Sequence, residues 1–454
     1  MKNNTGFPKR RKNSMDAVRL IALGFAGIIV LGMLLLALPA ASQSGRSIGL
    51  FDALFTSTSA VCVTGLVVRD TGTTFTLFGQ VVLLCLIQIG GLGFMTFATM
   101  LFRAIGRRVS LRERMLMRES MNEDSLSGLD ALIRWVMLSA FTVELVGAAL
   151  LSVRMIPRFG LAKGLFYSVF HAVSAFCNAG FDLFGNYSSL TGYVADPLMN
   201  FTVMMLIVVG GIGFGVLQDL RAYRRSRRLR LHTKIVLTAY AALFVFGVLF
   251  TLLAEWNNPA TLGALNFWQK LQAAMFHSVT LRTAGFNTID LAALRPASKL
   301  VNAMLMFIGA SPASTGGGIK VTTFAVIMLL VRMTVRGEDE LVVYRRKLGR
   351  DLVRRAIVVM MLAGGVLMLD CIAISLMQPE LALIDVVFEC ASAVGTVGVS
   401  AFGSAQLNSV SRAMIILTMF MGRIGPLTMA LVLTRRQRTT KTQLHYPEEH
   451  IMIG

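Results

Sequence analysis

The segment FTSTSAVCVTG, residues 55–65, decides the fold because the chain repeats its pattern three more times. The later copies read FHAVSAFCNAG at 170–180, FHSVTLRTAG at 276–285 and FECASAVGTVG at 388–398. Phenylalanine, serine and glycine recur at identical offsets in the first, second and fourth copies, whereas the third copy is one residue shorter between its phenylalanine and its glycine. One such segment would be weak evidence, but four copies in register indicate an internal repeat.

These segments lie in a chain that is apolar enough to enter a bilayer. Of its 454 residues, 55% are hydrophobic and only 15% are charged, and the mean hydropathy is +0.67. Several apolar runs are long enough, or nearly so, to cross a hydrocarbon core of ~30 Å. They are 21–38, 81–101, 203–217, 235–253, 357–374 and 413–433. We therefore predict an integral membrane protein, whose first run is a retained helix because no convincing cleavage site follows it.

The net charge of +20 is concentrated in blocks of lysine and arginine. Each block lies beside an apolar run, which is the arrangement that the positive-inside rule predicts for cytoplasmic segments. We therefore expect both termini in the cytoplasm. No basic patch is interleaved with stacking aromatic residues, which argues against a nucleic-acid partner. The blocks are 9–12, 103–118, 221–230, 345–355 and 435–441.

Consecutive basic blocks divide the chain into four similar stretches. Because each stretch begins and ends on the cytoplasmic side, it must contain an even number of complete crossings. Each contains an apolar span, a short amphipathic segment that is better described as re-entrant, a glycine-centred turn and a second span. We predict an all-α polytopic membrane protein with four tandem M1–P–M2 repeats (helix, re-entrant pore loop, helix) around a central pore, and hence eight transmembrane helices. The predicted boundaries are 1–16 for the N-terminal tail, 17–118, 119–230, 231–345 and 346–440 for the repeats, and 441–454 for the C-terminal tail.

The four glycine-centred turns predict a conduction path for a monovalent cation. A dehydrated cation in a bilayer needs oxygen ligands, and four equivalent strands around an axis can supply rings of backbone carbonyls. Glycine permits the backbone angles that turn successive carbonyls to one side, and each preceding half-helix directs its partially negative end toward the centre. The alternative is that these glycines only permit close helix packing. The predicted filter, acting mainly through main-chain oxygens, comprises Cys62, Val63, Thr64, Gly65, Cys177, Asn178, Ala179, Gly180, Arg282, Thr283, Ala284, Gly285, Gly395, Thr396, Val397 and Gly398.

A second glycine motif follows each turn, inside the next span. It reads GGLGF at 90–94, GGIGF at 210–214 and GRIGP at 422–426, whereas the third copy is an interruption, GASPASTGGG, at 309–318. Such a break can exist at membrane depth only where it lines a watery cavity or is covered by protein. Below the filter it would obstruct the pore, and we predict that it is a gate. A phosphate-binding loop is excluded because Ile319 separates Gly318 from Lys320 and no soluble βαβ unit surrounds the segment.

The predicted gate also includes an intramembrane cation. Arg423 takes the place of Gly91 and Gly211, so repeat symmetry directs it toward the pore, where a fixed guanidinium would repel an ion. The alternatives are a structural ion pair or an anchor on carbonyls. Lys320 could equally extend to the cytoplasmic surface. The predicted gate residues are Gly309, Ala310, Ser311, Pro312, Ala313, Ser314, Thr315, Gly316, Gly317, Gly318, Lys320 and Arg423.

Further charged residues lie close to the filter segments. Asp70, Asp182 and Asp290 follow filter glycines, where carboxylates would concentrate cations at an outer mouth; ordinary capping of the next turn is an equal alternative. Glu389 and Arg282 are expected to pair with each other, or with backbone, behind the filter rather than to contact the ion.

These residues resemble the Trk/Ktr/HKT superfamily of potassium transporters, and within it the Ktr-type membrane subunit. The resemblance covers nearly the whole chain. It rests on SAVCVTGL at 59–66, SAFCNAGFDL at 174–183, RTAGFNTID at 282–290, SPASTGGGIK at 311–320, ASAVGTVGVS at 391–400 and the ending YPEEHIMIG at 446–454. The sequence departs from the family's common pattern at Leu281, where proline is usual, and at Ala310 and Ala313, where glycine is frequent. We expect altered loop flexibility there.

The resemblance implies one filter glycine per repeat, a gating loop at 309–320 and a gating arginine, here Arg423. It implies potassium as the transported ion, leaves sodium open as an activator, and implies no organic cofactor bound by this chain. It also implies a homodimer with one pore per protomer, which sits in the lipid of a bacterial plasma membrane. A cytoplasmic ring of RCK-type subunits that bind ATP or ADP would regulate the pore.

Two other classes of protein fit the sequence less well. A secondary carrier of potassium or sodium with alternating access would favour inverted repeats and paired broken helices. Here the repeats are parallel and only one helix is expected to be strongly broken. An enzyme would need a nucleophile with its base, or a metal constellation, at membrane depth. His171 and His277 occupy matching points of two half-helices and are better explained as scaffold residues, so we predict that the protein is not an enzyme.

Overall fold

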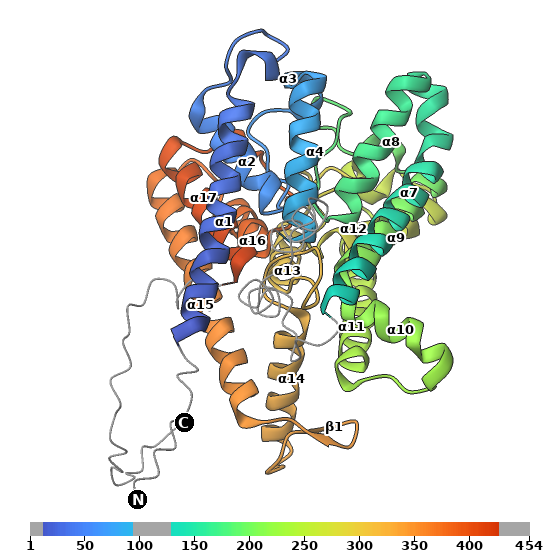
Figure 1. Cartoon of the computed structure of the whole chain (residues 1–454), viewed down its shortest axis with the longest axis vertical. Helices are drawn as coiled ribbons and strands as arrows, with labels where there is room; N and C mark the ends of the chain where they lie inside the picture. Colours follow the sequence, from blue (N-terminus) through green and yellow to red (C-terminus); the bar gives the residue numbers. More distant parts are fainter. Residues whose placement is uncertain (1–11, 94–128, 426–454) are drawn as a thin grey trace, which may run out of the picture.

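The computed structural model describes residues 12–93 and 129–425. The regular secondary structure of this part is helical except for a two-stranded hairpin, β1 (Val342–Val343) with β2 (Arg346–Lys347). The helices surround a central region of irregular backbone (Figure 1). They are α1 (Lys12–Leu36), α2 (Leu50–Val61), α3 (Thr71–Thr74), α4 (Leu77–Leu92), α7 (Leu129–Phe159), α8 (Leu161–Phe176), α9 (Pro197–Gly211), α10 (Phe214–Ser226), α11 (Leu231–Glu255), α12 (Phe267–Thr280), α13 (Pro296–Phe307), α14 (Val321–Val335), α15 (Arg350–Met377), α16 (Leu383–Gly395) and α17 (Ser409–Ile424).

Helices α1, α7, α11 and α15 are each long and apolar enough to cross a membrane. Large apolar side chains remain exposed along them, including Leu23, Leu145, Leu253 and Leu376. In water such exposure would be costly, but lipid tails are as apolar as these side chains. The exposed stripes are therefore explained by a bilayer, and the chain is a multi-pass membrane protein.

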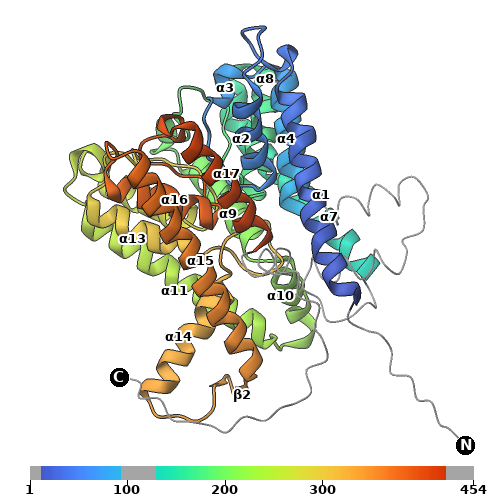
Figure 2. The same ribbon diagram turned by 90° about the vertical axis from the view of Figure 1, so that its left-hand side faces the viewer.

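Each long helix packs on the short helix that follows it: α1 on α2, α7 on α8, α11 on α12 and α15 on α16. The short helices are nearly filled with buried residues over their C-terminal halves. A further set of contacts joins successive units, since α4 packs on α8, α9 on α12, α13 on α16 and α17 on α2. The last contact joins the last described helix to α2, so the packing forms a closed ring; Figure 2 shows α17 beside α2.

The helices that follow the glycine-centred turns are interrupted at their own glycines. Helix α4 ends before Gly93, α9 before Gly213 and α17 before Gly425, and all three glycines have positive φ. The expectation of only one strongly broken helix is therefore wrong, because α9 and α10 meet at 97°. The bend arises where the left-handed Gly213 turns the chain and the Phe214 amide donates to the Ala313 carbonyl at 2.9 Å.

The helix that follows the third glycine-centred turn has the longest interruption in the described chain. Helix α13 ends at Phe307 and α14 begins at Val321. Between them Ile308 and Ile319 form a parallel bridge, and the Gly309 amide donates to the Ile319 carbonyl at 2.7 Å. Helix α14 and the hairpin then project beyond the rest of the bundle, at the end where α10 also lies (Figure 1). Residues 1–11 of the predicted N-terminal tail, the C-terminal tail, the basic blocks at 103–118 and 435–441, and the residues that follow Gly93 and Gly425 lie outside the described residues, whereas residues 12–16 belong to α1.

Candidate ion filter and gate

The four glycine-centred turns share one backbone conformation. Each turn glycine has positive φ, and so does the residue two positions before it, although none of those residues is glycine. Non-glycine residues adopt this region at a cost of about 1–2 kcal/mol. The pairs are Val63 and Gly65 (55° and 95°), Asn178 and Gly180 (59° and 70°), Thr283 and Gly285 (64° and 86°), and Thr396 and Gly398 (50° and 94°). Strain of this kind persists where the surrounding structure imposes it, commonly at functional sites.

The turn glycines form a closed ring in chain order. A Cβ added to Gly65 would lie 2.6 Å from the carbonyl oxygen of Ala179, the residue before the next turn glycine. The same relation holds from Gly180 to Ala284 and from Gly285 to Val397, at 2.9 Å each. A Cβ on Gly398 would meet the Thr64 carbonyl and so close the ring. Glycine is required here because the four backbones approach too closely for any side chain.

Hydroxyl groups at one position of the short helices hold the turns. The Ser59 hydroxyl accepts from the Gly65 amide, and the Ser392 hydroxyl accepts from the Gly398 amide, both at 3.0 Å. In the other two turns the hydroxyl donates to the carbonyl after the glycine, from Ser174 to Phe181 at 2.7 Å and from Thr280 to Phe286 at 2.5 Å. Thr280 thus replaces serine in the third copy. The missing residue of that copy consequently lies within the turn itself, between Thr280 and Gly285.

The two histidines on the short helices support the scaffold. His171 accepts from the Leu183 amide through Nε2 at 3.3 Å, with its Nδ1 2.7 Å from the Tyr167 carbonyl. His277 contacts Asn302 through Nε2 at 2.8 Å. Among the described residues, histidine, cysteine and carboxylate side chains form no cluster suited to a metal ion.

Close packing explains the second glycine motif. A Cβ on Gly90 would lie 2.8 Å from the Val61 carbonyl carbon, and one on Gly210 would meet the Phe176 carbonyl. A Cβ on Gly422 would lie 2.5 Å from the Val394 carbonyl oxygen. The first glycine of each motif therefore lets the helix that carries it touch the C-terminal end of the short helix in the same unit.

The interruption at 308–320 is bonded to these glycine motifs. The Ser311 amide donates to the Gly211 carbonyl at 3.0 Å, and the Gly318 amide donates to the Gly422 carbonyl at 3.1 Å. Thr315 makes two further bonds, from its amide to the Gly210 carbonyl at 3.2 Å and from its hydroxyl to the Phe176 carbonyl at 3.0 Å. The loop is therefore held against the ends of α8, α9 and α17.

Arg423 adds the first unit to this set of contacts. Its guanidinium donates to the Thr315 carbonyl in the loop and to the carbonyls of Gly90 and Gly91 at the end of α4. Within the described residues no carboxylate pairs with Arg423, so of the predicted alternatives the carbonyl anchor is the one present. Lys320 bonds the Gly316 carbonyl at 2.7 Å inside its own loop rather than extending to the surface.

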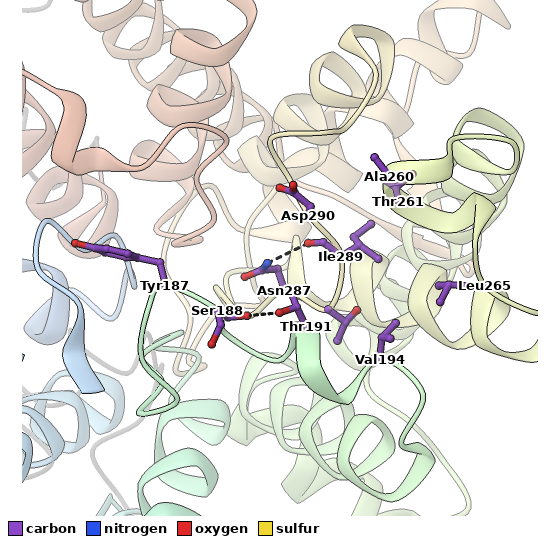
Figure 3. Close-up of a pocket in the computed structure, with 11 residues that line it drawn as sticks. Tyr187, Ser188, Thr191, Val194, Ala260, Thr261, Leu265, Asn287, Ile289 and Asp290 are labelled. Carbon is purple, nitrogen blue, oxygen red and sulfur yellow. Dashed lines mark hydrogen bonds between the residues drawn. The ribbon is translucent and has the colours of Figure 1, made fainter. Parts of the chain in front are cut away.

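The acidic residues near the filter act as turn caps. Asp70 accepts from the Thr73 amide at 2.8 Å and from the Tyr187 amide at 2.7 Å. Asp182 accepts from Phe184 at 3.0 Å, and Asp290 accepts from Ala292 at 2.9 Å. Asp290 also lines a cavity of about 400 Å³ between the segments that follow the second and third turns, together with Tyr187, Ser188, Thr191 and Asn287 (Figure 3). The sequence had not indicated this cavity.

Arg282 and Glu389 are not brought together. Glu389 accepts from the hydroxyls of Ser400 and Ser404. The Arg282 side chain is 2% exposed, its guanidinium lies 5.7 Å from the centre of the Tyr240 ring, and none of its nitrogens has a hydrogen-bond partner within the described chain. The expectation that the two residues pair is therefore wrong, because the third turn directs Arg282 toward α11 instead.

Comparison with known proteins places this arrangement in a family. The family model TrkH, described as a cation transport protein, matches residues 25–440. The chain belongs to this family of cation transport proteins. It is therefore a transporter and not an enzyme. Its membership agrees with the resemblance seen in the turn and loop motifs.

Full-length relatives are similar to this chain. It is 41% identical to the Ktr system potassium uptake protein B of Bacillus subtilis, over 96% of each chain. It is 40% identical to the protein of the same name from Vibrio alginolyticus, over 98% of this chain and 97% of that one. It is 36% identical to the potassium/sodium uptake protein NtpJ of Enterococcus hirae, over 98% and 99%. The crystal structure of the potassium transporter TrkH from Vibrio parahaemolyticus has the same fold, with a TM-score of 0.72 at 18% identity, over 94% of this chain and 86% of that one.

Proposed function

We propose that this chain is the potassium-conducting membrane subunit of a Ktr-type uptake system. The observation that carries the proposal is the closed ring of four turn glycines, each so close to the carbonyl that precedes the next one that an added Cβ would collide with it. Four alike turns around one axis can replace the hydration shell of a potassium ion with backbone oxygens. The names of the relatives at 41% and 40% identity support the choice of potassium.

The proposal divides the chain into four M1–P–M2 repeats with the predicted boundaries, and hence into eight transmembrane helices. Helices α1, α7, α11 and α15 are the first spans, α2, α8, α12 and α16 the pore helices, and the interrupted helices after them the second spans. The ring of packing from α4 on α8 round to α17 on α2 supports this division. The filter strands are residues 62–65, 177–180, 282–285 and 395–398.

The gate in this proposal is the loop at 309–320 together with Arg423. In its present position the loop is bonded to the second spans of the other three repeats, directly or through Arg423. A segment that crosses between all of them beneath the filter would block the path of an ion. Its attachments are single hydrogen bonds, so it can be displaced without unfolding a regular helix.

We propose the partners that the family resemblance implies. The chain forms a homodimer in the bacterial plasma membrane, with both termini in the cytoplasm, and binds a cytoplasmic ring of RCK-type subunits that respond to ATP or ADP. The projecting α14 and its basic hairpin are suited to contact that ring. The proposal allows sodium as an activator but does not require it.

A second candidate is a carrier of potassium or sodium with alternating access. The bend of 97° between α9 and α10, in addition to the interruption between α13 and α14, favours it more than the sequence did. So does the similarity to a protein named for potassium and sodium uptake.

The experiment that tests the proposal is ion flux from purified protein in liposomes under opposed potassium and sodium gradients. A potassium-selective conductance with no need for a co-transported ion supports it. Flux that stops unless sodium moves with potassium in fixed ratio would support the carrier, and no cation flux at all would refute both.

A further inference from the structure

The four turns differ at their left-handed residue in one chemical respect. Thr283 and Thr396 carry hydroxyl groups at this position, whereas Val63 and Asn178 do not. All four side chains are completely buried. The filter is thus alike in its backbone but unequal in its side chains, and the two hydroxyls belong to neighbouring turns.

The loop lies directly against these two hydroxyls. A Cβ added to Gly316 would fall on the Thr283 hydroxyl oxygen, with the Thr283 Cβ at 3.2 Å. A Cβ added to Gly317 would fall on the Thr396 hydroxyl oxygen, with Cγ2 of the same threonine at 3.0 Å. The loop needs consecutive glycines here because its backbone presses on the two threonine side chains.

Neither hydroxyl has a good partner within the protein. Thr396 Oγ1 is buried without any hydrogen-bond partner in the described chain. Thr283 Oγ1 has only the side-chain amide group of Asn178, at 3.5 Å, which is the outer limit of a hydrogen bond. Buried hydroxyls are almost always bonded, and an exception needs an explanation. At the inner end of a cation pathway, an oxygen that is kept unbonded is suited to be an ion ligand.

We propose that the hydroxyls of Thr283 and Thr396 form an inner binding site for a dehydrated monovalent cation, which the backbone of Gly316 and Gly317 covers while the loop is closed. This inference rests on the proposed function and adds a direct coupling to it. Withdrawal of the loop opens the path and also frees two ligands for the ion that enters the space. An ion held there in turn excludes the loop.

The proposed link between loop and ion site agrees with where the loop lies in the chain. The loop belongs to the third unit, whose turn supplies Thr283, and the Gly318 amide bonds the Gly422 carbonyl of the fourth unit, whose turn supplies Thr396. One anchor of the loop is therefore on the side of the pore that carries the hydroxyls, whereas Ser311 and Thr315 anchor it on the second unit. The other two turns, with Val63 and Asn178, offer the ion only backbone oxygen and an amide.

The test measures potassium flux and selectivity in liposomes for variants of the chain that lacks residues 313–317 as well as of the full chain. In the shortened chain, Thr396→Val should raise the potassium concentration that gives half-maximal flux by about three- to tenfold, the range that corresponds to one hydrogen-bonding group. Thr283→Val should act in the same direction by less, and Thr396→Ser should restore the original value.

The matched control is Thr58→Val, since Thr58 is also buried with an unpartnered hydroxyl but lies on α2. If Thr396→Val is not recovered as folded dimer, Thr396→Ala replaces it and should raise the potassium concentration for half-maximal flux in the same way. If Thr396→Val and Thr396→Ala behave like Thr58→Val while selective flux persists, the inner site is refuted and the proposed function stands. If the unmutated chain shows no selective flux, the proposed function itself fails.

Discussion

The filter and the loop beneath it differ in how the four units contribute to them. At the level of the turns, four units contribute the same left-handed pair of residues and the same hydroxyl position. At the level of the loop the four units differ, since one supplies a long irregular segment, one supplies Arg423 and the other two supply carbonyl acceptors. A ring of backbone carbonyls needs four turns of the same conformation, whereas a gate needs only one element that moves.

The two levels also differ in how they are held. Each turn is bonded mainly within its own unit, by the hydroxyl of its own short helix. The loop is bonded to other units through separate contacts, each of which contributes about 0.5–1.5 kcal/mol. A few such bonds can be exchanged when a regulatory partner binds. Substitutions in the filter should therefore impair ion selectivity, whereas substitutions in the loop should leave selectivity intact and raise flux.

The largest effect is expected from a side chain in the glycine ring. Gly180→Ala places a Cβ 2.6 Å from the Gly285 Cα and 2.9 Å from the Ala284 carbonyl oxygen. The carbonyl ring must then widen or tilt, and potassium preference over sodium should fall by about tenfold or more, which corresponds to ~1.4 kcal/mol of differential binding. Competitive flux of the two ions in liposomes measures this.

The control for that substitution is Gly160→Ala. Gly160 also has positive φ (80° against 70° for Gly180), but an added Cβ there meets nothing within 4 Å. The Gly160→Ala variant has the backbone strain without the contact to the ring, so its preference for potassium over sodium should equal that of the original protein. An equal loss of selectivity in both variants would assign the effect to general strain.

The next largest effect is expected from shortening the loop. Deletion of residues 313–317 removes the Thr315 contacts to Gly210, Phe176 and Arg423. Potassium flux should rise severalfold and lose its dependence on any co-expressed nucleotide-binding subunit, while selectivity is kept. Flux that stays unchanged in folded dimeric protein would mean that the loop is only an irregularity of the helix.

A smaller gain is expected from Arg423→Gln. The amide retains one donor but loses the charge and the fork that joins the loop to α4. Because the direct bonds from Ser311 and Gly318 remain, flux should rise less than in the deletion. Arg412→Gln on the same helix is the control, since Arg412 pairs with Asp52 at 3.1 Å, away from the loop. A fall in flux for Arg423→Gln alone would assign the arginine a role in conduction instead.

The smallest effect is expected from Thr315→Val. This change keeps the shape of the side chain and removes one hydrogen bond, from the Thr315 hydroxyl to the Phe176 carbonyl. A single bond at the lower end of the usual range corresponds to a gain in flux of about twofold, below the gain expected from the deletion. Thr238→Val should leave flux unchanged, because the Thr238 hydroxyl bonds only its own helix, at the carbonyls of Lys234 and Ile235. If the two variants match, the Thr315 bond does not hold the loop.

The sequence predicted what depends on residue type at a fixed spacing. Glycine is visible at every turn because no other residue fits, and a helix cannot continue through the proline and glycines between Phe307 and Val321. The left-handed conformation of Val63 and Thr396 was not predictable, since valine and threonine disfavour it and the surrounding ring imposes it. The same holds for Arg282, whose position beside Tyr240 depends on where the shortened third turn directs it.

Partners across the fold were also beyond the sequence. Repeat symmetry placed Arg423 at the level of the loop, but only the fold brings its guanidinium to the carbonyls of Gly90, Gly91 and Thr315. The bend at Gly213 was missed because the motif GGIGF predicts only a loosened helix. What decides the bend is the bond from Phe214 to the loop, which is a long-range contact.

The most direct test of the central claim, that one level selects the ion and the other gates it, measures rate and selectivity together on the same purified proteins. Gly180→Ala and the deletion of residues 313–317 are compared with the original chain in liposomes under opposed potassium and sodium gradients. The account predicts that the two properties separate: Gly180→Ala lowers selectivity with the loop still in place, and the deletion raises the rate at unchanged selectivity. A deletion that lowers selectivity as much as Gly180→Ala does would contradict the account.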